Sequence, residues 1–294
     1  MAAHSDAGTA MLIAQISDLH IKEPGALAYG RVNTAGLLEE VVRALNTLAP
    51  RPDLLIASGD LIDQGKPAEY AHLRDLLAPL RMRVLLVPGN HDERGALRAA
   101  LSAHTYLNDG GAFTHYTVED LEVRLIVLDT VSPGRTEGSL DGGRLDWLAA
   151  RLAEQPERPT IVVMHHPPVD TGLPLMDRLG LDKADAQALA QIVARHPNVE
   201  RILCGHVHRP IHARFAGTVV STCPSTGHQM NLDFRTTVPA GYIMEPPGYL
   251  LHLWVPGTGL VTHTAVVGAF DGPHPFFART ANAMKPVRKI SPAN

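Results

Sequence analysis

Short apolar runs that each end in polar residues are the feature that most constrains the fold of this chain. Near-continuous apolar strands of this kind alternate with stretches of helical spacing, such as residues 33–49 and 67–80. This alternation predicts an α/β fold with a sheet buried on both faces. In such sheets, functional groups gather just beyond the carboxyl ends of the strands. The polar residues at these ends are Asp18 and His20, Asp60, Asn90 and His91, His165 and His166, and His206 and His208.

Composition and charge narrow the class of protein. A length of 294 residues and a hydrophobic fraction of 45% predict a soluble globular chain with a sizeable core. The formal net charge of -4 gives no basic footprint, so we expect no nucleic-acid polymer as a partner. The apolar run at 11–16 is too short for a signal sequence or a membrane span. The two cysteines form no disulfide framework, so we predict a cytoplasmic protein without a membrane partner.

The character of the chain changes near Gly227, where a stretch rich in Pro, Gly and polar residues begins. We expect a disordered N-terminal tail at 1–10 and a catalytic domain at 11–226. An excursion at 227–248 and a hairpin at 249–270, which closes the catalytic domain, would follow. The remaining residues, 271–294, are predicted to form an irregular C-terminal tail.

The residue types at the strand ends are those that bind metal ions. Carboxylate oxygens, imidazole nitrogens and an amide oxygen suit divalent or trivalent Mn, Fe, Co and Zn, and the scarcity of cysteine disfavours a structural zinc site. Asp60 is the natural bridge between two ions, which can share a hydroxide and clamp a phosphoryl group for in-line attack. In Asp18-x-His20 and His206-x-His208, alternate residues of an extended segment would point to the same side. These features predict a site with two metal ions.

Five motifs, DLH, GD, GNHD, MHH and GHVH, occur in this order between residues 18 and 208 and resemble the signature of the calcineurin-like metallophosphoesterases. The whole chain most resembles the bacterial branch that contains class III cyclic-nucleotide phosphodiesterases and the related glycerophosphodiesterases. The resemblance implies a four-layer α/β/β/α sandwich with a dinuclear site. It also implies that the segment at 227–248 caps the site and joins subunits in a homodimer or a higher homo-oligomer.

The resemblance further implies a role for each matching residue. His91 would lie over the phosphate and assist the leaving group, and the Asp63 carboxylate would orient His91. His228 and Tyr29 are similar to a histidine and a tyrosine near the site of related glycerophosphodiesterases, and would contact the substrate. The first ion would be held by Asp18, His20 and His208, the second by Asn90, His165 and His206, and Asp60 would bridge the two.

These residues also have ordinary structural explanations. Asp18, Asp60 and Asn90 could be turn residues at strand ends, and Tyr29 could be a loop aromatic packed on the core. Of the two neighbours His165 and His166, one would be a ligand and the other a packing residue, and the family pattern favours His165. The metal site is the stronger interpretation because five strand ends supply matching ligand types.

The class of phosphoester depends on the charges near the ions. Related protein phosphatases read GDxxDRG, with an arginine that helps to bind a dianionic monoester. This chain reads GDLIDQG, with Gln64 in that place. The difference favours a monoanionic diester, unless Arg94 or Arg209 reaches the site from a nearby loop.

We therefore predict a dinuclear metal-dependent phosphodiesterase that acts on small diesters, either 3′,5′-cyclic nucleotides such as cAMP or glycerophosphodiesters. The alternatives are a metal-dependent nuclease, a broad phosphomonoesterase and a non-catalytic or structural metal-binding module on the same fold. A nuclease would need a basic, aromatic-lined track, which the net charge and an aromatic fraction of 5% disfavour. A non-catalytic module would have lost ligands, and a closed structural site would leave no spare histidine such as His91.

Overall fold

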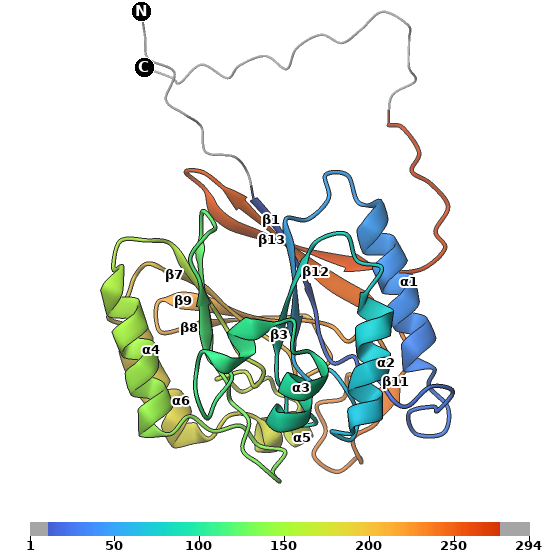
Figure 1. The fold of residues 1–294 in the computed structure, drawn as a ribbon, viewed down its shortest axis with the longest axis horizontal. Coiled ribbons are helices and arrows are strands. Elements are labelled where there is room, and N and C mark those ends of the chain that lie inside the picture. The colour runs from blue at the N-terminus through green and yellow to red at the C-terminus, as the bar shows by residue number, and fades with distance from the viewer. Residues whose placement is uncertain (1–10, 277–294) are drawn as a thin grey trace, which may run out of the picture.

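Two β-sheets face each other in the computed structural model, which describes residues 11–276 (Figure 1). Helices α1 and α2 lie on the outer side of one sheet, and α4 and α6 on the outer side of the other. The predicted four-layer α/β/β/α sandwich is therefore confirmed. The predicted N-terminal tail and most of the predicted C-terminal tail lie outside the described residues.

The first sheet has five strands in the order β13-β12-β1-β2-β3. Strands β1, β2 and β3 run parallel, so their carboxyl ends reach the same edge of the sandwich. The register pairs Ala14 with Leu55 and Leu55 with Val84. The strands are β1 (Met11–Ile16), β2 (Leu54–Ser58), β3 (Arg83–Val87), β12 (Gly248–Val255) and β13 (Gly259–Val266).

The second sheet has six strands in the order β4-β5-β6-β7-β9-β8. Strands β5, β6, β7 and β9 are parallel, whereas β4 and β8 are antiparallel edge strands. The hairpin that the sequence predicts around Gly217 is formed by β8 and β9. The strands are β4 (Tyr116–Val118), β5 (Arg124–Val127), β6 (Thr160–Val163), β7 (Val199–Cys204), β8 (Ile211–Phe215) and β9 (Thr218–Thr222).

The helices begin where the sequence places capping side chains. The Asn33 side chain accepts a hydrogen bond from the main-chain N–H of Gly36, and Asp141 accepts one from Arg144 at the start of α4. The helices are α1 (Thr34–Thr47), α2 (Pro67–Leu77), α3 (Arg94–Ala100), α4 (Gly142–Glu154), α5 (Pro174–Leu179) and α6 (Lys183–Val193).

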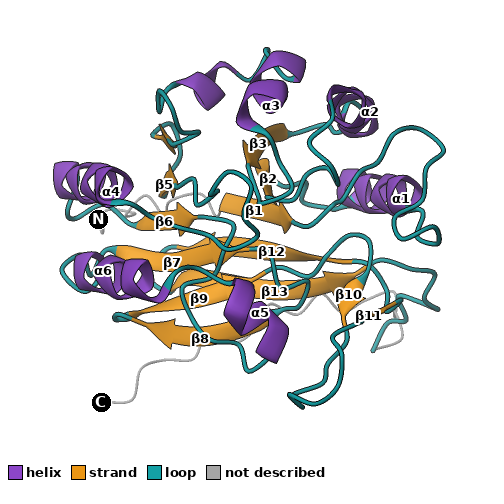
Figure 2. Cartoon of the chain, turned by 90° about the horizontal axis from the view of Figure 1, so that it is seen from below, coloured by secondary structure: helices purple, strands orange, loops and turns teal. Residues whose placement is uncertain are grey.

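Several short elements are absent from the sequence prediction. Helices α3 and α5 and the 3₁₀ turn at Thr105–Asn108 are too short to show a clear helical period. The segment at 227–248 contains a two-stranded ladder of β10 (Gln229–Met230) and β11 (Tyr242–Ile243), which lies beside α5 in Figure 2. This ladder positions one wall of the site described below.

Alternation along β5 shows how the layers are packed. Leu125 and Val127 lie in a core cluster shared by both sheets, whereas Ile126 packs in a second cluster with Leu148 of α4 and Leu189 of α6. The parallel strands are thus buried on both faces, as their near-continuous apolar sequences predict. In the described part of the chain, no helix is long and apolar enough to span a membrane.

We expect Arg124→Met to lower the free energy of unfolding by about 3 kcal/mol. Arg124 is 1% exposed, and it donates hydrogen bonds to Glu119 (2.8 Å), Glu154 (3.0 Å) and the main-chain oxygen of Arg151. The substitution removes all three hydrogen bonds, and the main-chain oxygen of Arg151 loses its side-chain donor. Urea unfolding of Arg83→Met is the control, because Arg83 pairs with exposed Asp120 and its loss is expected to cost only about 0.5 kcal/mol. Equal losses in the two variants would contradict the prediction.

Candidate metal centre

The carboxyl ends of five parallel strands meet at one edge of the sandwich and bring the predicted ligand types together. All of these side chains are buried except Asn90 and His91, which are partly exposed. In the first sheet, β1 leads into Asp18 and His20, β2 into Asp60, and β3 into Asn90 and His91; in the second, β6 leads into His165, and β7 into His206 and His208.

The carboxylate of Asp60 lies between side chains of both sheets. Its Oδ1 is 3.4 Å from Nε2 of His165 in the second sheet. Its Oδ2 is 3.8 Å from Nε2 of His20 and 4.0 Å from Nε2 of His91, both in the first sheet. The two oxygens therefore face different imidazoles, which is the arrangement that a carboxylate shared by two ions requires.

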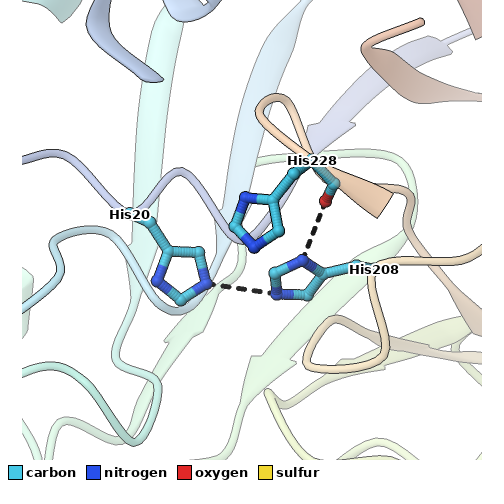
Figure 3. A group of neighbouring side chains, drawn as sticks. All are labelled: His20, His208 and His228. Carbon is cyan, nitrogen blue, oxygen red and sulfur yellow. Dashed lines mark hydrogen bonds between the residues drawn. The ribbon is translucent and has the colours of Figure 1, made fainter. Parts of the chain in front are cut away.

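Further ligand types lie on either side of Asp60. Nε2 of His208 is 3.1 Å from Nε2 of His20 and 3.3 Å from Oδ1 of Asp18, and Figure 3 shows the rings of His20 and His208 turned toward each other. Nδ1 of His206 is 3.1 Å from Oδ1 of Asn90. Two groups of nitrogen and oxygen atoms are thus arranged around one carboxylate.

Main-chain carbonyls fix which nitrogen of three imidazoles carries the proton. Nδ1 donates to Ser58 O in His165 (2.9 Å), to His228 O in His208 (2.9 Å) and to Asp63 O in His91 (2.7 Å). Since a carbonyl only accepts hydrogen bonds, Nε2 of each neutral ring keeps its lone pair. In His208 that lone pair lies 3.3 Å from the Asp18 carboxylate, so two acceptors face each other, an arrangement that favours a cation between them.

Unpartnered nitrogens provide a second test of whether metal ions fit. Among residues 11–276, Nε2 of His165 and Nε2 of His206 are buried and have no hydrogen-bond partner. A buried polar atom without a partner is costly in a folded protein, and ordered water or an ion usually satisfies it. Carboxylate, imidazole and amide donors suit Mn, Fe, Co or Zn, so the residues present fit a metal centre.

The electrostatics keep both carboxylates ionised. Burial raises the pKa of the Asp60 carboxyl, but the nearby imidazoles, His165 foremost, outweigh burial and hold this pKa well below its usual range. Burial also raises the pKa of Asp18, and His208 more than offsets that effect, so the pKa is lowered. Two buried negative charges without a fixed cation would be unstable, which favours cations at this position.

The imidazoles divide into neutral and protonated rings. Burial lowers the pKa of His165, but the Asp60 carboxylate more than offsets this effect and raises the pKa to about 9. Burial, together with repulsion from His165, lowers the pKa of His206 to about 3. In the absence of ions, a proton on His165 would therefore compensate part of the carboxylate charge.

The backbone around the ligand types is left-handed rather than extended. The φ angles are 53° at Asp18, 45° at His20, 70° at His206 and 52° at His208. The expectation that an extended segment aims each Asp-x-His or His-x-His pair is therefore wrong. Non-glycine residues rarely adopt positive φ, and such conformations cluster at functional sites where the surroundings enforce them.

Two glycines allow the sheets to approach each other at this edge. A Cβ atom on Gly59, which has a φ of 102°, would lie 2.2 Å from Nδ1 of His165. A Cβ atom on Gly205 would lie 2.0 Å from Oγ of Ser17. Side chains at these positions would push the strand ends apart, so the close approach requires glycine.

Asp63 contacts His91 through a different atom from the one predicted. Its main-chain oxygen accepts the hydrogen bond from His91, whereas its carboxylate lies 2.5 Å from Lys22 Nζ and 3.6 Å from His20 Nδ1. The predicted carboxylate contact is thus corrected to a carbonyl contact. Burial raises the pKa of Asp63, but His20 and Lys22 outweigh it and lower that pKa. Sequence reasoning missed Lys22, which has no motif of its own.

His228 and Tyr29 lie beside the residues that are predicted to bind the metal ions. One ring nitrogen each of His20, His208 and His228 lies within 4.8 Å of the others. Figure 3 shows the three rings grouped together. Tyr29 Oη is 3.4 Å from His228 Nε2, and the Tyr29 ring stacks on Tyr242 with centroids 4.9 Å apart. Tyr242 was not predicted as a site residue, because it could equally have been ordinary core.

The neighbouring histidine His166 has a packing role. Its Nδ1 is 2.8 Å from Thr130 Oγ1, and its Nε2 donates to the main-chain oxygen of Thr136 at 2.9 Å. Both nitrogens are therefore occupied by protein atoms. Burial lowers the pKa of His166 well below its usual range, so the ring is neutral.

A cavity of about 300 Å³ opens over these residues. Within the described chain, no lysine or arginine lines it. Arg94 donates to both oxygens of Asp129 (2.7 and 3.0 Å), and Arg209 donates to Met230 O (2.6 Å) and Glu245 (2.5 Å). The two arginines that could have reached the site thus bind other partners.

A buried polar network joins the sheets behind the site. Gln15 Nε2 donates to Ser58 Oγ (2.8 Å) and to Cys204 O (3.0 Å), which belongs to the other sheet. Gln15 Oε1 accepts from His252 Nε2 (2.9 Å). Since Ser58 O binds His165, this network fixes the spacing of the strand ends that carry the site.

Comparisons with known proteins agree with this geometry. A family model described as calcineurin-like phosphoesterase matches residues 11–210. A protein of Arcobacter nitrofigilis named probable glycerophosphodiester phosphodiesterase GpdQ is 35% identical over 267 residues, covering 91% of this chain and 97% of the relative. A probable cyclic nucleotide phosphodiesterase of Synechococcus is 35% identical over 249 residues, covering 82% of this chain and 91% of the relative.

A solved structure shares the fold. The dimetal phosphatase from Danio rerio superposes with a TM-score of 0.60, covering 88% of this chain and 99% of the other. Its sequence identity of 14% limits the likeness to the fold.

We expect the metal-stripped protein to lose stability as the pH rises from 6.5, the usual pKa of histidine, to about 9, the pKa of folded His165. In this window the folded protein keeps a proton that the unfolded chain releases, so the free energy of unfolding falls, by about 2–3 kcal/mol in all.

Urea unfolding at both ends of this window tests the prediction. Saturation with Mn²⁺ is the control, because a ligand nitrogen bound to a metal ion carries no such proton and the decline should disappear. A stripped protein that is equally stable at both pH values would contradict the assignment of the proton to His165.

Proposed function

The chain belongs to the calcineurin-like phosphoesterase family, and from this premise we propose that its cavity hydrolyses small phosphodiesters. Relatives at this level of identity are named as glycerophosphodiester and cyclic nucleotide phosphodiesterases, which makes the chain a metal-dependent phosphodiester hydrolase. The observation that carries the proposal is a cavity with two groups of metal-ligand types around Asp60 and no arginine or lysine among its described lining residues.

Two metal ions, drawn from Mn, Fe, Zn and Co, would occupy the site. The unpartnered nitrogens and the two-sided position of Asp60 support this assignment. When bound, the ions lower the pKa of water to supply a nucleophile and neutralise charge on the phosphoryl oxygens. Asp18, His20 and His208 would hold one ion, Asn90, His165 and His206 the other, and Asp60 would contact both.

His91 would deliver a proton to the leaving alcohol. Its Nδ1 is held by Asp63 O, so Nε2 is free to face the cavity that His91 lines. In the metal-free protein burial lowers the pKa of His91, but Asp60 and the Asp63 carbonyl more than offset this effect, so the pKa is raised. A positioned acid of this kind suits an alkoxide leaving group. Tyr29 and His228, which line the same cavity, would contact the substrate.

The charge of the cavity favours a diester over a monoester. A monoester is a dianion, and enzymes that prefer it add arginines to the metal ions. Arg94 and Arg209 are engaged by Asp129 and Glu245, so they cannot serve this purpose without breaking those contacts. The same lack of basic residues disfavours a nuclease. A non-catalytic module is disfavoured because every ligand type is present.

We also propose the location, the domain bounds and the oligomeric state of the enzyme. Two buried free cysteines support a reducing cytoplasmic location. We propose a catalytic domain at 11–226 that is completed by the hairpin at 249–270, and a homodimer or higher homo-oligomer formed through the excursion at 227–248. Exposed apolar side chains on this excursion support the interface; they are Leu232, Phe234, Tyr242, Ile243 and Met244.

We expect chelator-stripped protein to be inactive and Mn²⁺ to restore hydrolysis, with kcat/KM for bis(4-nitrophenyl) phosphate at least about tenfold above that for 4-nitrophenyl phosphate. The physical reason is the lack of cationic side chains for the second charge of the monoester. Asp60→Ala, which removes the shared carboxylate, serves as the inactive control. Preference for the monoester would contradict the proposal, as would full activity and metal content in Asp60→Ala.

We expect His91→Ala to lower kcat by about a hundredfold or more on a diester with an alkyl leaving group, because the alkoxide then leaves without a proton. The loss should be smaller for 4-nitrophenolate, which leaves easily. Metal content, measured by elemental analysis, should stay that of the wild type. His263→Ala is the matched control, since His263 is exposed on β13. Equal losses of kcat for both leaving groups would contradict the assignment of His91 as the general acid.

A further inference from the structure

A second cavity adjoins the metal-centre cavity. It has a volume of about 340 Å³ and lies between α5 and the excursion at 227–248. Pockets that bury drug-sized ligands have roughly 300–1,000 Å³, so either cavity alone is at the lower end of this range. The two cavities share five lining residues, which form a common boundary: Leu175, Met176, Met230, Ala240 and Gly241.

The boundary is connected to the metal centre through Met230. Met230 of β10 pairs with Tyr242 of β11, and the main-chain N–H of Asn231 donates to Gly241 O (2.8 Å). Met230 O in turn accepts a hydrogen bond from Arg209, the residue after His208. The two strands that carry this boundary are thus held in a defined position relative to His208.

The lining of the second cavity is mixed: apolar side chains such as Leu173 and Val238 lie beside polar groups, which the boundary lacks. Arg235 donates from its main-chain N–H (3.0 Å) and its Nε (2.9 Å) to Asp233, which orders the polar side of the loop. Other lining side chains are Asn231, Thr236 and Thr237. These groups include both hydrogen-bond donors and acceptors, a mixture that matches hydroxyl groups, which donate and accept.

We propose that the second cavity binds one alcohol arm of the phosphodiester and selects an arm that carries a hydroxyl-rich ring, such as a sugar or a cyclitol. The inference rests on the proposed function, because the metal centre must hold the phosphate. The ester linkage then crosses the apolar boundary beside Gly241, and the ring reaches Asn231 and the Asp233–Arg235 pair. A diester with a short arm uses only the first cavity.

Gly241 offers a direct test of this geometry. A Cβ atom built on Gly241 meets no other atom within 4 Å, and Gly241 is not among the residues with positive φ. A larger side chain at this position is therefore compatible with the fold and would narrow the boundary between the cavities. Gly142 at the start of α4 has the same open surroundings and lines neither cavity, so Gly142→Leu is a matched control.

The experiment compares two diesters that differ only in one arm, glycerophosphoinositol and glycerol methyl phosphate, with Mn²⁺-loaded protein and phosphorus NMR detection. We expect the wild type to favour the inositol diester in kcat/KM by about tenfold or more, and Gly241→Leu to lose most of that preference. Asn231→Ala should raise KM for the inositol diester, and Gly142→Leu should match the wild type.

The outcomes separate the two proposals. Equal kcat/KM of the wild type on both diesters, or a preference that Gly241→Leu retains, would overturn the role of the second cavity while leaving the phosphodiesterase proposal intact. Failure of the loaded wild type to hydrolyse either diester would overturn both.

Discussion

The buried carboxylate of Asp60 is the constraint on which the rest of the site depends. It is 2% exposed, and a charge buried to this degree is costly unless cations or donors surround it. His20 approaches it from the first sheet and His165 from the second, while the main-chain N–H of His91 donates to its Oδ1 (2.9 Å). One charge thus requires two sheets to end at the same place. Asp60 itself has a φ of 48°, so the left-handed backbone of the strand ends includes the residue at the centre of the site.

The two sheets are held to this geometry from behind. Gln15 is fully buried and connects Ser58 at the end of β2 with the carbonyl of Cys204 at the end of β7. Its remaining oxygen is bound by His252, whose pKa is lowered to about 3 by burial, so this ring stays neutral and keeps a fixed pattern of donors and acceptors. A fully satisfied buried network specifies one arrangement of the groups that it joins. The spacing of the ligand types is therefore set by residues that do not touch the cavity.

Apolar periodicity was sufficient for the alternation of strands and helices and for the residue types at the strand ends, because these are local signals. The four layers were predicted only through the resemblance to the calcineurin-like metallophosphoesterases. The sequence could not reveal which atom of Asp63 binds His91, since that depends on the turn after β2. It also left open whether Arg94 and Arg209 reach the phosphate, because their partners Asp129 and Glu245 lie 35 and 36 residues away along the chain. Tyr242 was missed because stacking on Tyr29 is a contact between distant segments.

Arg209 connects the chemistry of the site with its choice of substrate. It directly follows the ligand-type residue His208, yet it does not line the metal-centre cavity. Instead it donates to Met230 O and Glu245, and thereby anchors the excursion beside the cavity. These contacts keep the Arg209 cation away from the metal centre, where it could bind the second negative charge of a monoester. The same contacts position the wall that the arm of a diester must pass. The wall and the metal centre also share a contact, because the main-chain oxygen of His228 in the excursion accepts the hydrogen bond from Nδ1 of His208. Changes in the excursion can therefore alter the accepted arm without disturbing the metal centre only where they leave this contact in place.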